Sequence, residues 1–196
     1  MPITELSQLD VHATYTYADY LTWQVKERLE LFKGRISLMS PAPNMYHQKI
    51  VTKLSVFIGH YLLDKSCQAF VAPFDVRLPK RGSQPTDNIY TVVQPDICVI
   101  CDESKLDVQG CNGAPDLMVE VLSPGNSRKE MREKYSLYED AGVKEYWLVD
   151  PSHPSLTRYV LNEAGIFIGL QPLTDLDRVE TDLLPGWSVE LKQVFG

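Results

Sequence analysis

Residues 115–151 read PDLMVEVLSPGNSRKEMREKYSLYEDAGVKEYWLVDP. The run LMVEVL within this segment is almost continuously apolar, which favours a strand covered on both faces of a sheet. The turn SPGNS leads into a helix predicted from about residue 127 to residue 141, before Gly142, a residue type that commonly ends helices. A second apolar strand, KEYWLVD, ends at Pro151. These elements predict an α/β fold with strands in the middle of a sheet.

Two helices and a hairpin are predicted before this segment. A helix is expected from Thr16, a plausible N-cap, to Glu27, and a hairpin turn at Lys33-Gly34. The longest predicted helix follows Asn44, where apolar side chains recur at intervals of three and four residues. That stripe consists of Ile50, Leu54, Phe57, Ile58, Tyr61 and Leu62.

Further strands complete the expected domain. VVQPDICVI, residues 92–100, is one of the two most strand-like segments. A hairpin is expected across Glu163-Ala164-Gly165, and an acidic stretch, residues 175–182, precedes a short final strand near Trp187. We expect one domain over residues 1–196, an α/β fold with a mixed central β-sheet flanked by helices, and a β-rich C-terminal extension over residues 156–196.

The composition is that of an ordinary globular protein, with 44% hydrophobic and 23% charged residues. Its apolar runs are shorter than the ~20 residues that a membrane-spanning helix requires. The first residues, MPITELSQLD, lack the layout of a signal peptide. We therefore expect a cytoplasmic protein with no membrane partner.

The cysteines are interpreted as reduced thiols, because the chain shows no secretion signal. Cys98 and Cys101 have the spacing of a metal-binding pair, but side chains three positions apart in a strand point to opposite faces. Buried apolar thiols are therefore favoured over the alternative, a zinc site. The four residues concerned are Cys67, Cys98, Cys101 and Cys111.

The net charge of −7 argues against a general nucleic-acid coat, because such proteins are usually basic. A phosphate-binding surface must then be local, and a solvated surface of mixed charge is the alternative for each basic group. The polar loop from Lys80 to Tyr90 is a possible contact element or a disordered segment. The basic candidates are Arg128, Lys129, Arg132 and Lys134; Lys80 and Arg81; and Lys26, Arg28, Lys33 and Arg35.

Asp96 and Glu120 each interrupt an apolar strand, where an isolated ionised carboxylate is costly. Alternation along the strand places Glu120 on one face with Met118 and Leu122. A cation held between the two carboxylates, or a positively charged side chain that points at them, would offset this cost.

Lys134 is the positively charged candidate, because it interrupts the apolar stripe of the helix that follows. In the alternative, Lys134 lies at the edge of the stripe, where its ammonium reaches water or pairs with Glu130. The aromatic residues nearby are interpreted as core residues, with base stacking as the alternative. They are Tyr135, Tyr138, Tyr146 and Trp147.

Pro95-Asp96, Glu120 and the segment from Pro115 to Pro151 together resemble the Uma-two-type putative restriction endonuclease family, a branch of the PD-(D/E)XK nuclease superfamily. RLELFKGRISLMSPAP and Tyr46-His47 resemble further parts of that family. The resemblance covers about residues 15–155 and implies a restriction-endonuclease-like fold.

The resemblance also implies roles for individual residues. Asp96 and Glu120 match the superfamily's metal ligands, and Lys134 matches the catalytic lysine, displaced from its usual place two positions after the glutamate to the next helix. Glu30 matches an early acidic position that adds a ligand or positions water, with an ordinary edge-strand acid as the alternative. His47 matches a histidine at a helix start, either a general base or second metal ligand, or a structural residue.

Hydrolysis of a phosphodiester needs an activated water and neutralisation of phosphoryl charge, both of which Mg²⁺ or Mn²⁺ supplies. Two carboxylates with a backbone carbonyl, that of Val121, suit such a cation, while Lys134 acts on water and phosphate. We predict a metal-dependent endonuclease that cleaves DNA as a homodimer, because two strands need two sites. The alternatives are a catalytically silent nucleic-acid-binding or regulatory module, and a metal-dependent hydrolase of a small phosphorylated compound, which needs a closed pocket.

Overall fold

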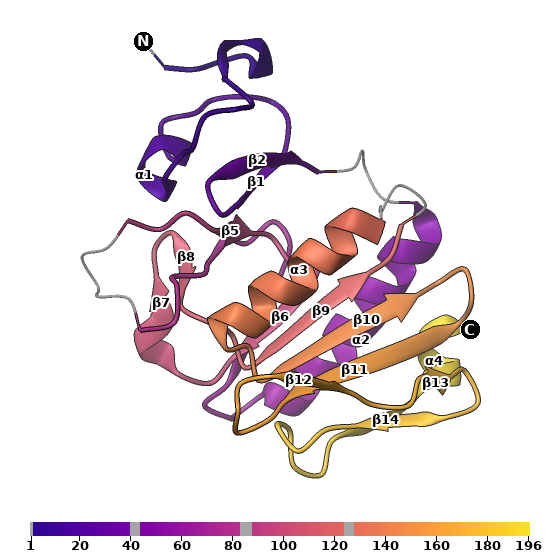
Figure 1. The fold of residues 1–196 in the computed structure, drawn as a ribbon. Helices are drawn as coiled ribbons and strands as arrows, with labels where there is room; N and C mark the ends of the chain where they lie inside the picture. Colours follow the sequence, from indigo (N-terminus) through magenta and orange to yellow (C-terminus); the bar gives the residue numbers. More distant parts are fainter. Residues whose placement is uncertain (1, 40–43, 83–87, 124–127) are drawn as a thin grey trace.

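The computed structural model describes residues 2–39, 44–82, 88–123 and 128–196. Within this part of the chain, the largest sheet has seven strands and is mixed (Figure 1). β9 and β10 are parallel neighbours at its centre, and the other strand pairs are antiparallel. The predicted mixed α/β architecture is therefore confirmed. The strands are β3 (Gln68–Val71), β6 (Ile97–Ile100), β9 (Leu117–Val121), β10 (Glu145–Asp150), β11 (Ser155–Leu161), β12 (Phe167–Gly169) and β13 (Leu173–Thr174).

The two long helices cover opposite faces of this sheet (Figure 1). α2 (Met45–Leu62) begins after Asn44, whose side chain accepts a hydrogen bond from the His47 amide at 3.0 Å. The apolar stripe of α2 packs on one face of β6 and β9. α3 (Arg128–Ala141) packs Leu137 and Tyr138 on the other face. Both helices were predicted with nearly these bounds.

A second sheet holds six strands in the described residues, in the order β2, β1, β5, β4, β8 and β7. Its hairpin closes at Lys33-Gly34, as predicted, and both residues have positive φ. A Cβ on Gly34 would lie 2.5 Å from Thr14 Cγ2, so the turn requires glycine for space as well as for conformation. The strands are β1 (Leu29–Phe32), β2 (Arg35–Leu38), β4 (Val76–Arg77), β5 (Val92–Val93), β7 (Leu106–Asp107) and β8 (Gly110–Asn112).

The strand-like segment 92–100 is divided between the two sheets. β5 belongs to the six-stranded sheet, whereas β6 belongs to the seven-stranded sheet. Pro95 lies between them and has no amide hydrogen to contribute to a ladder. The chain therefore changes sheets at residues 94–96, and Asp96 lies at this junction.

The helix predicted from Thr16 to Glu27 is too long. α1 spans only Tyr17–Tyr20, although Thr16 is its N-cap and forms a capping box with Asp19. Beyond α1, Leu21 is 54% exposed and Trp23 pairs with Ile3. The aromatic side chains of this segment pack on one another instead of forming a continuous helical stripe.

The C-terminal region contains the predicted hairpin β11–β12 and three elements that the pattern does not predict. These are β13, β14 (Arg178–Glu180), inside the acidic stretch, and α4 (Leu191–Phe195), after the expected final strand β15 (Ser188–Glu190). Val179, Trp187 and Val194 join the core under α2. Short 3₁₀ turns occur at Leu6–Gln8 and Glu103–Lys105.

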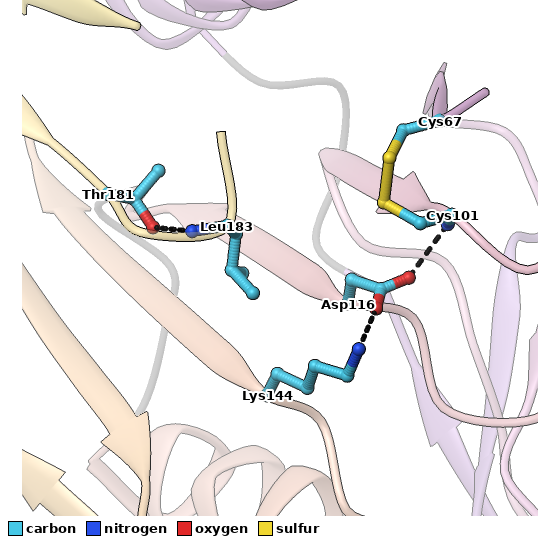
Figure 2. The surroundings of a disulfide bond; sticks show 6 residues. All are labelled: Cys67, Cys101, Asp116, Lys144, Thr181 and Leu183. Atoms are coloured by element: carbon cyan, nitrogen blue, oxygen red, sulfur yellow. Dashed lines mark hydrogen bonds and ion pairs between the residues drawn. A yellow bond between two sulfur atoms is a disulfide. The ribbon is translucent and has the colours of Figure 1, made fainter. Parts of the chain in front are cut away.

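The reduced-thiol interpretation is wrong for two of the four cysteines, because Cys67 and Cys101 form a disulfide (Figure 2). In the antiparallel β3–β6 register, Gln68 pairs with Ile100. Cys67 directly precedes Gln68 and Cys101 directly follows Ile100, so the two cysteines lie opposite each other. Cys98 and Cys111 are buried free thiols, as expected. Cys98 packs on the α3 side and Cys101 on the α2 side, so the predicted opposite orientation of this pair is confirmed.

None of the helices in the described part of the chain is both long and apolar enough to cross a membrane.

Leu54 tests the packing of α2 on the sheet. It is completely buried, so Leu54→Ala is expected to lower the free energy of unfolding by about 2–5 kcal/mol. Val56→Ala on the same helix is the control, because Val56 is 61% exposed and its truncation should cost less than about 0.5 kcal/mol. Urea denaturation of both variants measures the difference. Equal losses would contradict the orientation of α2.

Candidate active site

The register of β6 and β9 brings Asp96 and Glu120 together. Ile97 pairs with Val119 in antiparallel orientation, so the preceding and following residues, Asp96 and Glu120, lie opposite each other. Asp96 Oδ2 accepts a hydrogen bond from the Val121 amide at 2.8 Å. Backbone geometry therefore fixes this pair of carboxylates.

Glu120 faces α3. Its neighbours Val119 and Val121 belong to the core under α2, whereas Met118 belongs to the core under α3, as alternation predicts. Glu120 Oε1 accepts two hydrogen bonds, from Lys134 Nζ at 2.9 Å and from the Tyr138 hydroxyl at 2.5 Å. The carboxylate is thus held through one of its two oxygens.

Lys134 is buried, with 6% of the residue exposed, and its ammonium does not reach water along the edge of the helix. Its Nζ also lies 3.1 Å from Glu30 Oε1. Burial alone would favour the neutral amine, but the adjacent carboxylates of Glu120 and Glu30 outweigh it and raise the pKa of Lys134 above its ordinary value. Lys134 is therefore a fixed positive charge between two acids.

Glu30 is a buried residue of β1, with 2% exposed. β1 lies between β2 and β5, so the alternative of an edge-strand acid is wrong. Glu30 Oε1 also accepts a hydrogen bond from the Gln94 amide at 2.8 Å. Lys134 thereby connects an acid of the six-stranded sheet with an acid of the seven-stranded sheet.

Glu120 has a perturbed pKa. Burial raises the pKa most, the ammonium of Lys134 opposes this effect, and the neighbouring carboxylates of Asp96 and Glu30 raise it further. The net result is a pKa of about 7. Three carboxylates share a small volume with one ammonium group, and this excess of negative charge favours either a proton or a metal cation.

His47 lies in the first turn of α2 and is 4% exposed. Its Nε2 is 3.2 Å from Asp96 Oδ2. Its Nδ1 is buried and has no hydrogen-bond partner among the residues that the structure describes. The structure thus brings all five predicted side chains, those of Asp96, Glu120, Lys134, Glu30 and His47, into one connected group.

Tyr138 is a further member of this group, which the sequence pattern assigned to the core, with base stacking as the alternative. Burial, with the carboxylates of Glu120 and Glu30, raises its pKa well above the ordinary value, so its hydroxyl remains a donor at neutral pH. The signal in the sequence is its position one helical turn after Lys134, on the same face of α3.

The donor chemistry of the group fits a hard divalent cation. Carboxylate oxygens suit Mg²⁺ and Mn²⁺, and Mg²⁺ commonly keeps several waters and takes few protein ligands. Within the described ranges, no group of three or more His, Cys, Asp or Glu side chains is placed so that it could hold a metal ion. A cation here would therefore depend on Asp96 and Glu120 with a backbone carbonyl.

A family model described as "Putative restriction endonuclease" and named Uma2 matches residues 17–192. This chain belongs to the Uma2 family. The match continues past residue 155, where the resemblance recognised in the sequence ends, and includes the C-terminal strands.

Two similar proteins place this Uma2 chain among its relatives. It is 27% identical over 150 residues to "Uncharacterized protein slr1290" of Synechocystis, a match that covers 75% of this chain and 74% of the relative. Its fold is similar to the crystal structure of a "putative nuclease belonging to DUF820" from Anabaena variabilis, with a TM-score of 0.72 and 18% identity. That match covers 92% of this chain and 97% of the other, and it confirms the predicted fold.

The perturbed pKa of Glu120 gives this Uma2 protein a specific pH dependence in metal-free buffer. The folded chain holds the Glu120 proton more tightly than the unfolded chain, so the associated stability is complete at acidic pH and is lost as pH rises towards about 7. Glu120→Gln removes this loss. The free energy of unfolding of the variant, relative to wild type, should therefore increase between about pH 5 and about pH 7, by up to about 1.4 kcal/mol per pH unit.

Urea denaturation in EDTA at several pH values measures this difference. Glu145→Gln is the matched control, because Glu145 is a buried glutamate of the adjacent strand that pairs with Arg158 at 3.0 Å. A constant difference between Glu120→Gln and wild type over this pH range would show that the Glu120 carboxyl is not perturbed.

Proposed function

We propose that this protein is a metal-dependent endonuclease that hydrolyses phosphodiester bonds in DNA. The observation that carries the proposal is the convergence of Asp96, Glu120 and Lys134, with the ammonium 2.9 Å from the Glu120 carboxylate. The description of the Uma2 family and the name of the Anabaena protein support the same class of reaction.

Mg²⁺ or Mn²⁺ would be held by the carboxylates of Asp96 and Glu120 and the carbonyl of Val121, and when bound it supplies an activated water and neutralises phosphoryl charge. The chain's own groups prepare this site. The Val121 amide and His47 engage Asp96 Oδ2, while Lys134 and Tyr138 engage Glu120 Oε1. One oxygen of each carboxylate is thereby held in place.

Lys134 has a second task in this proposal. Its ammonium stays charged because two carboxylates flank it. A fixed positive charge beside the metal ligands stabilises negative charge that develops on the phosphoryl oxygens, and it orients the attacking water. Glu30 positions Lys134 and has no direct part in the chemistry.

The dimensions at the site favour a polymeric substrate over a small phosphorylated compound. The cavity that Glu120 lines holds only about 20 Å³, whereas an open groove of about 430 Å³ adjoins it and continues along α3 into another of about 670 Å³. A nucleic-acid strand can lie along such grooves and present one phosphate group to the carboxylates of Asp96 and Glu120. Cleavage of both strands of a duplex would need two sites, and a homodimer is the simplest source of them.

Cleavage of supercoiled plasmid by the purified protein with Mg²⁺, Mn²⁺ or EDTA tests the proposal. We expect metal-dependent nicking by wild type, slowed about 10²–10⁴-fold in Asp96→Asn, Glu120→Gln and Lys134→Met. An intact plasmid with both metals would contradict DNA cleavage and favour a silent binding module. Full activity of Lys134→Met alone would refute the role of the lysine but retain the metal site.

Two matched controls separate the chemistry from the general effect of losing a buried acid. Asp116 is a buried aspartate that, like Asp96, accepts a backbone hydrogen bond, here from the Cys101 amide at 2.7 Å, and it faces a cation, Lys144 (Figure 2). Glu145 is the corresponding control for Glu120, because it pairs with the cation of Arg158 at 3.0 Å as Glu120 pairs with Lys134 at 2.9 Å. Asp116→Asn and Glu145→Gln should retain wild-type cleavage, and losses equal to those of the site variants would refute the assignment.

A further inference from the structure

An open groove of about 430 Å³ lies between α3 and the strands β10 and β11. Its residues include the two guanidinium groups of Arg128 and Arg132 and three tyrosine rings. None of these side chains is needed to hold the carboxylates of the candidate active site. The groove thus has both aromatic and basic character.

The aromatic part of the groove is preorganised. Tyr146 is 1% exposed, and its ring stacks with that of Tyr159 at 5.6 Å and an interplanar angle of 22°. Tyr135 meets Tyr159 edge to face at 5.1 Å. Tyr135 and Tyr159 are both partly exposed, so ring surface reaches the groove from a buried aromatic layer. A planar apolar ligand can stack here without prior ordering of these side chains.

The basic part of the groove lies on α3. Arg128 and Arg132 are exposed and are four positions apart, so their side chains extend along the same side of the helix. Both also line the adjoining groove of about 670 Å³, where Lys33 pairs with Asp140 and Lys129 with Glu133. In a chain with a net charge of −7, the two arginines therefore carry the local positive charge suited to phosphate groups.

The groove is continuous with the candidate active site. It shares Met131, Tyr146 and Leu148 with the small cavity that Glu120 lines. Leu148 pairs with Glu120 across the parallel strands β9 and β10, and Tyr159 lies one strand further out. Since neighbouring strands are about 4.8 Å apart and Tyr159 pairs with Tyr146, two residues before Leu148, the backbone of the groove begins about 5 Å from Glu120 and reaches about 12 Å at Tyr159. This is the range in which the nucleotide next to a bound phosphate would lie.

We infer that this groove binds one unpaired nucleobase of a nucleic-acid strand, stacked on the ring of Tyr135, with the flanking phosphates at Arg128 and Arg132. The inference rests on the proposed function and adds a substrate class to it, namely a strand that is single or locally opened. In a closed duplex each base is paired and stacked inside the helix, and its faces are not accessible to the tyrosine rings.

Fluorescence anisotropy in EDTA tests this inference without any cleavage step, using a labelled single-stranded oligonucleotide and a duplex of the same sequence. We expect wild type to bind the single strand more tightly than the duplex. Tyr135→Leu should weaken single-strand binding about 5- to 100-fold, because the stacking ring is lost. Tyr135→Phe keeps the ring and should bind as wild type does, so it also controls for folding.

Arg132→Gln tests the phosphate contact, with Arg178→Gln of β14 as the matched control. Arg132→Gln should weaken binding and reduce its dependence on salt concentration, whereas Arg178→Gln should change neither. The inference would be overturned if Tyr135→Leu bound the single strand as tightly as wild type does, or if wild type bound the duplex more tightly than the single strand. Either result would overturn it even if the plasmid is cleaved. Tyrosine-dependent binding by a protein that cleaves nothing would support the inference and refute the proposed function.

Discussion

The ammonium group of Lys134 lies between the carboxylates of Glu120 and Glu30, at 2.9 and 3.1 Å. These three side chains come from α3, β9 and β1, so one buried charge connects the helix with both sheets. Without the lysine, the acids would face one another in a space that water hardly reaches, a costly arrangement for ionised groups. The ammonium therefore permits the site to concentrate the negative charge that a metal cation requires.

The division of segment 92–100 between two sheets is the second constraint. Gln94 donates its amide to Glu30, and Asp96, two residues later, accepts from the Val121 amide. A continuous strand would place both residues in a single sheet and separate the two groups of acids. Because the chain changes sheets around Pro95, Gln94 binds Glu30 of the six-stranded sheet and Asp96 lies beside Glu120 of the seven-stranded sheet. His47, at the start of α2, completes the group beside Asp96.

The sequence predicts the residues that interrupt apolar patterns better than those that match them. Glu120 and Lys134 are recognisable because a charge occupies an apolar strand and an apolar helical stripe, and the structure buries Lys134 and leaves only 13% of the Glu120 side chain exposed. Tyr138 fits the apolar pattern, so its hydroxyl contact with Glu120 is not predictable from periodicity. The Cys67–Cys101 disulfide and the brevity of α1 depend on strand register and long-range aromatic packing, which local patterns do not encode.

The central claim is that a divalent cation binds to Asp96, which the Val121 amide and His47 orient, and to Glu120, which Lys134 and Tyr138 orient. Titration with Mn²⁺, monitored by electron paramagnetic resonance, measures cation binding directly. The titration compares wild type with Glu120→Gln and with the matched variant Glu145→Gln. The account predicts saturable binding by wild type that is retained in Glu145→Gln, lost in Glu120→Gln, and stronger as pH rises towards the Glu120 pKa of about 7. Equal binding by wild type and Glu120→Gln at every pH would contradict it.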